Sequence, residues 1–467
     1  MKIKKYFFII CFCFFGCWLY SKEANYNLPY IEEYQLENGL RILVSPNYDN
    51  PIVHVNVNIN VTKFDVPKNK VGLAKNSYSD NMLSTKKYPD EDTIHKKLIS
   101  LGSEDGSFES DYIGRYRTSI SHYFLKSDLN DAVELLSEVL IYPTFKMKFF
   151  LNVETYFSNI LEKMFFLKES DHTLVDAHAD YMHANIINSI NEVINYSRKD
   201  KINWYKSYIR PENITLMFTG DINPIYIKKL VSAYFGKWNA PTPAPKKNIF
   251  TNNITDSSGI KVRFINVPNN KDVRFAILKT SPNLNDKLFH EGSLAHSAFG
   301  DKGFSSRLSK IHSKFDNYSF LQSTMYPLTS FPSIYIDGKM KYENFDSLYR
   351  EIHNEFITLS NKSITQEELD RLKTIQINSY NNKLFKPDVF NQFIQQNYNF
   401  NGHSLNKISE KWDKINNATL DDVNLMASKI FDPNNYIIVI FGDKDSSATL
   451  LNDFENVDYY EQTEKLR

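Results

Sequence analysis

The residues of this chain that could do chemistry are its 11 histidines and the stretch VGLAKNSYSDNMLSTKKYP at residues 71–89. A zinc site on one helix needs two histidines four residues apart, because this spacing puts both imidazoles on one face. No two histidines in the sequence have this spacing. His172, His178 and His183 come nearest, but intervals of six and five residues spread the rings around a helix. We therefore expect these three to be solvated helix residues rather than metal ligands.

Other catalytic classes find little support in the sequence. The glycine-rich phosphate-binding motifs and the G-x-S-x-G hydrolase motif are absent. All three cysteines, Cys11, Cys13 and Cys17, lie near the N-terminus, so the rest of the chain has no disulfide, thiolate ligand or cysteine nucleophile. Lysine plus arginine equals aspartate plus glutamate, at 55 each, which gives no basic field for nucleic acid.

The N-terminus has the pattern of an export signal. Lys2, Lys4 and Lys5 precede an apolar run at residues 6–20, which is shorter than the ~20 residues of a membrane-spanning helix. We expect residues 1–21 to be a signal peptide, and the protein to cross the inner membrane to the periplasm or envelope. Two outcomes stay open: cleavage near Ser21, or lipid attachment at Cys17, since FFGC loosely resembles a bacterial lipobox.

An internal repeat organises the remaining chain. YIRPENITLMFTGD at 208–221 and IFDPNNYIIVIFGD at 430–443 share a Pro-x-Asn, an apolar strand and a terminal Gly-Asp, 222 residues apart. GLRILVSP at 39–46 and GIKVRFINVP at 259–268 repeat at an interval of 220. Two agreeing intervals indicate duplication of a unit of about 220 residues. A chain of 467 residues is also too long for one typical core.

Each unit combines strands with helices. Valine and isoleucine alternate with His54, Asn56 and Asn58 over residues 53–61, which predicts a half-buried strand. Apolar residues recur at helical spacing in 128–140, 149–167, 344–359 and 366–381. A proline-rich stretch at 239–248 separates the halves. We expect two homologous domains, 28–240 and 251–455, joined by a linker at 241–250, each a sheet with helices packed on it.

Five stretches occur in an order and spacing that resemble one family. They are ENGLRILVSP, GLA…ML…TKKYP, LISLGSEDGSFESDY, YIRPENITLMFTGD and GFSSRLSKI. Together they resemble the pitrilysin/insulinase zinc peptidases, a family that includes mitochondrial processing peptidase and the bc1 core proteins. The resemblance implies an α+β fold of two homologous domains, each a mostly antiparallel sheet carrying helices.

The resemblance also indicates where a zinc site would lie. In active members GLA is followed by the inverted motif His-x-x-Glu-His, whose three functional positions fall here on Lys75, Tyr78 and Ser79 without a gap. Protonated lysine has no lone pair for zinc, and a serine hydroxyl is a poor ligand. The family's third ligand would fall near Tyr156, with Glu154 and Glu162 close by. We expect no catalytic residue and no metal here.

The second half retains part of its own family signature. The resemblance implies an arginine and a tyrosine that hold the substrate carbonyl. Arg307 falls on the arginine position, whereas Phe320 stands where the tyrosine is expected, two residues after Tyr318. Arg307 could donate bidentate hydrogen bonds to a peptide, and Phe320 could stack on it. These two residues are the predicted substrate-binding residues.

The predicted function is a non-catalytic, zinc-free subunit that binds peptide or unfolded protein along residues 104–112 by strand addition. Its expected partner is a zinc-bearing relative in a heterodimer, or a second copy in a homodimer, with no nucleic acid and with a lipid anchor as an alternative. Zinc would be a cofactor only if the family activity is retained. Two other functions stay open: an active zinc endopeptidase with displaced ligands, and a purely structural subunit of an envelope complex.

Overall fold

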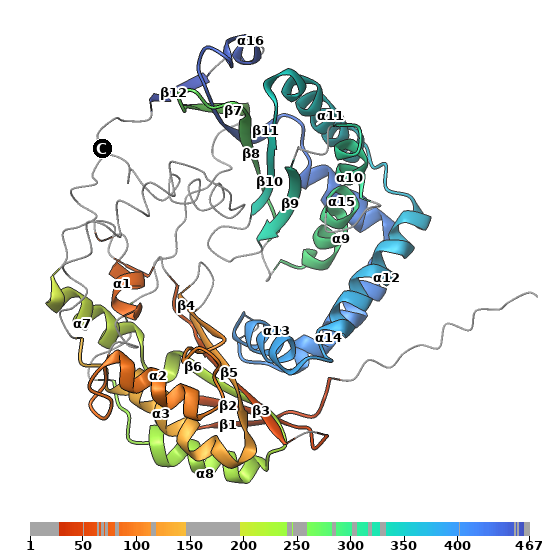
Figure 1. Cartoon of the computed structure of the whole chain (residues 1–467). Coiled ribbons are helices and arrows are strands. Elements are labelled where there is room, and N and C mark those ends of the chain that lie inside the picture. The colour runs from red at the N-terminus through yellow and green to blue at the C-terminus, as the bar shows by residue number, and fades with distance from the viewer. Residues whose placement is uncertain are drawn as a thin grey trace, which may run out of the picture.

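The chain forms two six-stranded sheets with helices packed on them (Figure 1). The computed structural model describes residues 28–49, 51–62, 65–66, 70, 73–79, 84–113, 118–145, 197–240, 245, 259–282, 286–300, 306–315, 320–326, 333–400, 402–452, 454 and 457–461. The predicted helix at 149–167 and most of the predicted linker lie outside these residues.

The first sheet has the strand order β1-β2-β6-β3-β5-β4. Its strands are β1 (Glu32–Gln35), β2 (Arg41–Pro46), β3 (Ile52–Ile59), β4 (Ser110–Ile113), β5 (Thr118–Leu125) and β6 (Ile214–Gly220). The pair β2 and β6 is parallel, and the other neighbours are antiparallel. β4 is therefore an edge strand of this sheet.

Helices of the first half build the core on one face of this sheet. They are α1 (Leu73–Ser79), α2 (Glu91–Ser100), α3 (Leu129–Ile141), α7 (Arg198–Tyr208) and α8 (Pro224–Phe235). The valines of β3 and the apolar residues of α2, α3 and α8 share one buried cluster. The N-terminus of α2 is fixed by Asp90, whose side chain accepts from Thr93 N at 2.9 Å. The predicted helix at 128–140 is confirmed as α3.

The second sheet has the order β12-β7-β11-β8-β10-β9. Its strands are β7 (Gly259–Asn266), β8 (Val273–Thr280), β9 (Phe320–Tyr326), β10 (Ser333–Met340), β11 (Asn435–Gly442) and β12 (Val457–Glu461). β12 pairs with β7 and lies beyond residue 455, the predicted end of the second domain. The sheet therefore extends to Glu461.

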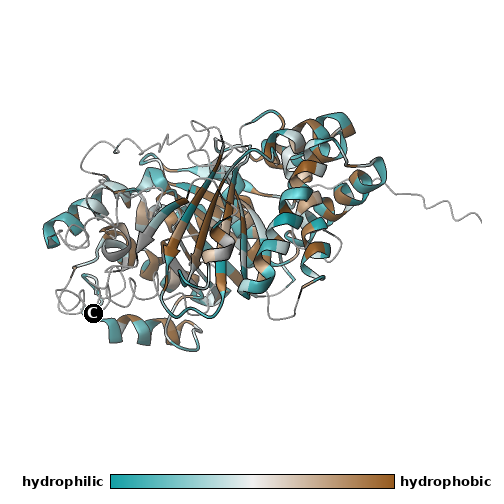
Figure 2. Cartoon of the chain, turned by 90° about the horizontal axis from the view of Figure 1, so that it is seen from above, coloured by the Kyte–Doolittle hydropathy of each residue, from teal (hydrophilic) through white to brown (hydrophobic). Residues whose placement is uncertain are grey.

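The second half contributes eight helices in the described residues. They are α9 (Phe289–Phe299), α10 (Arg307–His312), α11 (Tyr342–Ser360), α12 (Gln366–Asn382), α13 (Pro387–Phe400), α14 (Asn406–Asn416), α15 (Leu420–Ile430) and α16 (Ala448–Leu451). Those predicted at 344–359 and 366–381 are confirmed as α11 and α12. Figure 2 shows the apolar strands in the middle of the molecule, with helices that carry polar residues outside them.

The two sheets repeat the same topology. The series β2-β6-β3-β5-β4 matches β7-β11-β8-β10-β9, and the parallel pair β2 and β6 corresponds to β7 and β11. β6 and β11, which lie in the two copies of the sequence repeat at 208–221 and 430–443, occupy the same position in their sheets. The predicted α+β class, with two homologous and mostly antiparallel sheets, is confirmed.

The structure explains the Gly-Asp that ends β6. Gly220 has a φ of +140°, and a Cβ there would lie 2.1 Å from Ile52 O. Only glycine fits so close to the neighbouring strand. Asp221 then forms an ion pair with Lys126, which follows β5, at 2.7 Å. The motif thus ties together two strand ends that are distant in the sequence.

The opposite face of the first sheet is covered by the second half. Apolar residues of α12, α13 and α14 form a cluster with Leu43 and Met217 of the first sheet (Figure 1). The prediction that β3 is half-buried is therefore wrong. His54, Asn56 and Asn58 are 1–3% exposed, because α13 lies over them.

In the described part of the chain, every helix is too short or too polar to cross a membrane.

Candidate functional site

The helix that carries the former zinc positions is α1. It contacts α7 and the edge strand β4. Ser77 Oγ donates to Leu73 O at 2.5 Å, which uses its hydroxyl within the helix. Tyr78, at the position of the family's glutamate base, is 2% exposed and lies in the core of the first half. Lys75 and Ser79 belong to the same helix.

The position of Tyr78 decides what this helix can do. A phenol with an ordinary pKa near ~10 is a poor base toward water at neutral pH. Here its side chain is also packed among apolar residues instead of facing solvent. Within the described residues, no group of three or more His, Cys, Asp and Glu side chains could hold a metal ion. Tyr156, Glu154, Glu162 and the histidines at 172, 178 and 183 lie outside those residues.

Next to α1 lies the edge strand β4. The predicted substrate strand at 104–112 is wrong over most of its length, because only residues 110–113 form a strand. Before it, Asp105 accepts from Ser107 N at 2.9 Å and from Ser107 Oγ at 2.6 Å, and these hydrogen bonds lower the pKa of Asp105. Gly106 has a φ of +75°, and a Cβ there would come within 3.0 Å of His95. Residues 103–107 are thus held in a turn.

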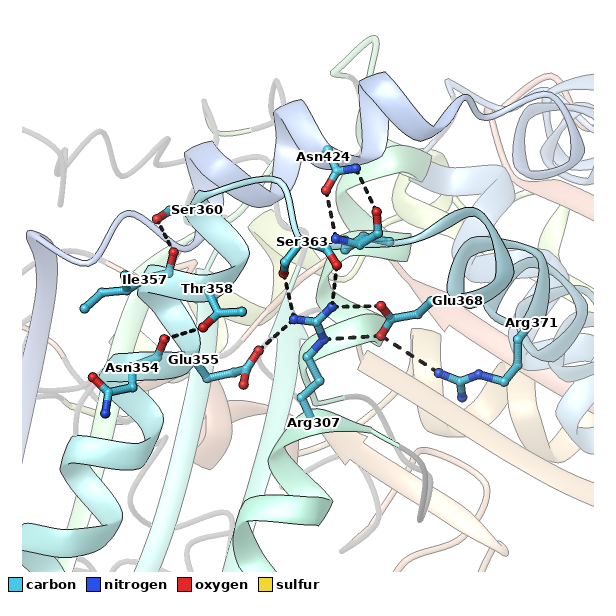
Figure 3. A network of polar contacts seen from close by, with 11 residues as sticks. Arg307, Asn354, Glu355, Ile357, Thr358, Ser360, Ser363, Glu368, Arg371 and Asn424 are labelled. Atoms are coloured by element: carbon cyan, nitrogen blue, oxygen red, sulfur yellow. Dashed lines mark hydrogen bonds and ion pairs between the residues drawn. The ribbon is translucent and has the colours of Figure 1, made fainter.

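In the second half, Arg307 begins α10 and lies within a dense polar network (Figure 3). Its Nη1 donates to Glu355 Oε1 and to Ser363 Oγ, each at 2.8 Å. Its Nη2 donates to Glu368 Oε2 at 2.8 Å and to Ser363 O at 3.2 Å, and Nε donates to Glu368 Oε1 at 3.2 Å. All five N–H groups of the guanidinium therefore have acceptors. Substrate binding by Arg307 stays a prediction, and it requires a peptide to displace one of them.

Phe320 is the first residue of β9, the edge strand of the second sheet. It pairs with Lys339 of β10, and its side chain is half-buried. α10 contacts β9, so Arg307 and Phe320 lie on neighbouring elements. Tyr318 lies outside the described residues. The structure thus brings the two predicted substrate-binding residues into one region of the second half.

A polar seam between the halves was missed in the sequence. Asn391, Gln395 and Asn399 of α13, spaced four residues apart, face β3 and β6. Asn391 Nδ2 donates to His54 Nδ1 at 2.8 Å and to His54 O at 3.2 Å. Gln395 Nε2 donates to Thr215 O at 2.8 Å and to Asn56 O at 3.0 Å, and Asn399 Nδ2 donates to Asn58 Oδ1 at 2.8 Å. The four-residue spacing of these three amides could have indicated in the sequence that one face of the helix is polar and makes directed hydrogen bonds.

Burial in this seam changes the chemistry of His54. Desolvation lowers the pKa of His54 to about 4, partly opposed by Asp388. The neutral ring can accept from Asn391 at Nδ1, whereas a protonated ring cannot. Tyr123 lies beside it, with ring centroids 4.6 Å apart, and its hydroxyl donates to Asp388 at 3.0 Å. The seam is therefore built for an uncharged imidazole.

A cavity of about 300 Å³ lies between α9 and α14 of the second half, away from α1. Its lining carries both signs of charge: Lys287, His290, Glu291, Glu410, Asp413, Lys414 and Asn417. His290 Nδ1 has no hydrogen-bond partner there, and burial lowers the pKa of His290 to about 4. Two lysines and three carboxylates line it, so groups that would attract and groups that would repel a ligand of either charge lie side by side.

Comparisons with known proteins show that others share this fold. Residues 195–376 match the family model described as the peptidase M16 inactive domain. A search of curated proteins gives no match. A protease from Helicobacter pylori has a TM-score of 0.72 at 16% identity, with 89% of this chain and 100% of that chain covered. A peptidase M16 inactive domain from Pseudomonas fluorescens has a TM-score of 0.72 at 15% identity, covering 89% and 98%.

A third similar structure shows how the chain relates to a larger protein. The first half of the periplasmic protease PqqL from Escherichia coli has a TM-score of 0.67 at 16% identity, covering 90% of this chain and 93% of that one. The chain covers only 48% of the complete PqqL structure. It therefore has about half the length of that protease.

The structure has a duplicated fold of two similar sheets, and its helix α1 carries Lys75, Tyr78 and Ser79 at the positions that the resemblance assigns to the zinc motif. The predicted likeness to the pitrilysin/insulinase fold is confirmed: residues 195–376 match the peptidase M16 inactive domain model, and solved structures of the same fold cover about nine-tenths of the chain.

Proposed function

We propose that this protein is a non-catalytic, zinc-free peptidase-fold subunit that binds peptide and pairs with an active zinc peptidase. The observation that carries the proposal is the set of residues at the zinc-motif positions of α1. All three functional positions of the zinc motif are replaced, and Tyr78, at the base position, is packed in the core. The match of residues 195–376 to an inactive peptidase domain supports the same conclusion.

Peptide binding is assigned to β4 and its surroundings. An edge strand presents backbone N–H and C=O groups that an extended peptide can pair with. β4 contacts α1, so a peptide added there would lie against the altered zinc helix. Arg307 and Phe320 of the second half would contact the same peptide, by hydrogen bonding and stacking respectively. The proposed location is the periplasm or the cell envelope.

Metal content and hydrolysis test the catalytic part of the proposal. The purified protein is dialysed, its zinc is measured by elemental analysis, and it is incubated with a quenched fluorescent peptide. We expect far less than one zinc per chain and no chelator-sensitive cleavage. Stoichiometric zinc with cleavage that a chelator abolishes would instead establish an active endopeptidase with displaced ligands.

Affinity purification from the native host tests the pairing. We expect a relative that carries His-x-x-Glu-His to be recovered with the chain, and the pair to hydrolyse peptide. Recovery of the chain alone, or of copies of itself without hydrolysis, would contradict the heterodimer.

A second candidate, a purely structural subunit, is favoured by the Arg307 network. Its five N–H groups already have acceptors within the second half, which is what a residue that supports the fold requires. Peptide affinity separates the two candidates. A structural subunit would not bind an extended peptide at concentrations where the peptide-binding subunit does.

A further inference from the structure

One end of the first sheet exposes several large apolar side chains. We call this group the apolar rim. Of the 14 large apolar residues that are exposed in the described part of the chain, six belong to it: Tyr30, Tyr48, Ile52, Leu125, Ile225 and Tyr226. They are 43–68% exposed. Single exposed apolar residues are ordinary, but a group of them at one place marks an interaction site.

The backbone brings these residues together. Ile52 and Leu125 are directly paired across β3 and β5. Asp221 N donates to Ile52 O at 3.4 Å, which places the turn before α8 at the same end. Ile225 and Tyr226 lie in the first turn of α8. The rim therefore joins a strand pair to the start of a helix.

Tyr30 and Tyr48 complete the rim on its other side. Ser45 Oγ, near the end of β2, donates to Tyr30 O at 2.9 Å. Asn47 N donates to Gly220 O at 2.8 Å, so the turn between β2 and β3, which contains Tyr48, lies beside the end of β6. Tyrosine carries an apolar ring and a polar hydroxyl, which suits a boundary between apolar and aqueous phases.

The charges at the rim favour no charged partner. Lys126 and Asp221 neutralise each other in an ion pair of 2.7 Å. Tyr30 donates its hydroxyl to Glu32 at 3.0 Å. Exposed Lys228 and Lys229 follow Tyr226 on α8, and exposed Asp49 follows Tyr48. With Lys126, Asp221 and Glu32 they give three positive and three negative side chains, so the surface does not select anionic lipid or nucleic acid. We therefore expect the apolar rim to contact a neutral apolar surface.

The N-terminal sequence indicates which neutral apolar surface the rim contacts. The described chain begins at Leu28, two residues from Tyr30, and the preceding sequence holds the apolar run at 6–20. The 14 residues from Cys17 to Tyr30 can span at most about 45 Å. With a lipid attached at Cys17, one of the two outcomes expected for the N-terminus, this tether keeps the rim near the bilayer that holds the lipid. We propose that the apolar rim docks on the surface of a lipid bilayer. This proposal is independent of peptide binding.

Site-specific fluorescence tests the proposal. The chain has no cysteine after Cys17, so a new cysteine can be labelled alone once Cys11, Cys13 and Cys17 are changed to serine. The full chain with Tyr48→Cys is labelled with an environment-sensitive nitrobenzoxadiazole dye and mixed with phosphatidylcholine vesicles. The matched control is Tyr459→Cys on β12 of the second sheet, at the far end of the molecule and 57% exposed (Figure 1).

We expect the dye at residue 48 to shift to shorter wavelength and gain intensity with vesicles, and the dye at residue 459 to change little. Ile225→Cys provides a second rim position if Tyr48→Cys does not fold, as judged by circular dichroism. The absence of a shift at both rim positions would overturn the proposal and leave a protein partner as the occupant. Equal shifts at the rim and at residue 459 would overturn it too, because they indicate adsorption without orientation.

Discussion

Replacing Arg307 with alanine is expected to destabilise the protein by about 2–4 kcal/mol. The guanidinium is 15% exposed, and its partners Glu355 and Glu368 are 20% and 16% exposed. Removing one partner of a fully buried ion pair costs about 3–5 kcal/mol, since the remaining charge stays buried and unpaired. Partial exposure of the two carboxylates reduces this cost, which gives the lower range. The loss corresponds to a fall in Tm of roughly 5–15 °C.

Arg350→Ala is the matched control. Arg350 also pairs with a carboxylate, Asp346, at 2.9 Å, but their side chains are 62% and 50% exposed. An exposed pair one helical turn apart contributes about 0.3–0.5 kcal/mol, so this variant should unfold close to the wild type. Urea unfolding and thermal scans of both variants measure the difference. If Arg307→Ala unfolds with the same midpoint as Arg350→Ala, the inference that the network stabilises the second half is refuted.

The same variant separates a structural role from a substrate-binding role. If Arg307 binds a peptide carbonyl, its loss removes a charge-assisted hydrogen bond worth about 1.5–3 kcal/mol, roughly a tenfold to hundredfold loss of affinity. This affinity is measured at a temperature where the variant is folded. Weaker peptide binding with unchanged unfolding would support substrate binding, whereas lower stability with unchanged affinity would support the structural role.

Three further predictions follow from the seam and the N-terminus. Gln395→Ala should lower the free energy of unfolding by about 1–3 kcal/mol, since two buried carbonyls lose the donor at Gln395. Urea titrations measure this, with Gln396→Ala as the control because Gln396 is exposed; a similar loss in that variant would contradict the prediction. The pKa of His54 is lowered to about 4 in the folded protein, so as the pH falls the unfolded chain binds the proton before the folded chain does. The contribution of neutral His54 to the free energy of unfolding is therefore complete above about pH 6.5 and is lost as the pH falls toward 4. His54→Gln should therefore flatten the dependence of stability on pH between 4 and 6.5, and an unchanged slope would exclude His54 as its source. N-terminal mass spectrometry of the native protein should show residues 1–21 removed or a lipid on Cys17, and an intact Met1 would contradict export.

The seam gives these predictions a common physical basis. The second half joins the first through directional hydrogen bonds from Asn391, Gln395 and Asn399, as well as through apolar contacts. Buried amides need partners with defined geometry, because an unpaired polar group in the interior is costly. The seam therefore specifies how α13 lies on the sheet, in addition to holding it there.

Much of the fold could be predicted because its signals are local. The alternation in residues 53–61 and the helical periodicity in 128–140, 344–359 and 366–381 each predicted an element that the structure contains. The expectation that a peptide adds as a strand along residues 104–112 agrees less well with the structure, in which only residues 110–113 form a strand. A turn fixed by Asp105 and Gly106 precedes this strand, and the family resemblance did not indicate this turn.

The sequence alone determined the duplicated α+β architecture and the loss of the zinc motif at Lys75, Tyr78 and Ser79. Periodicity and residue identity at a motif position are properties of short segments, so they can be read without knowing what packs where. Only the tertiary structure decided the environment of His54, whose partner Asn391 is 337 residues away, and of Arg307, whose partners are 48–61 residues away. The polar face of a strand looks the same in a sequence whether water or α13 covers it, since burial depends on which distant segment the fold brings into contact.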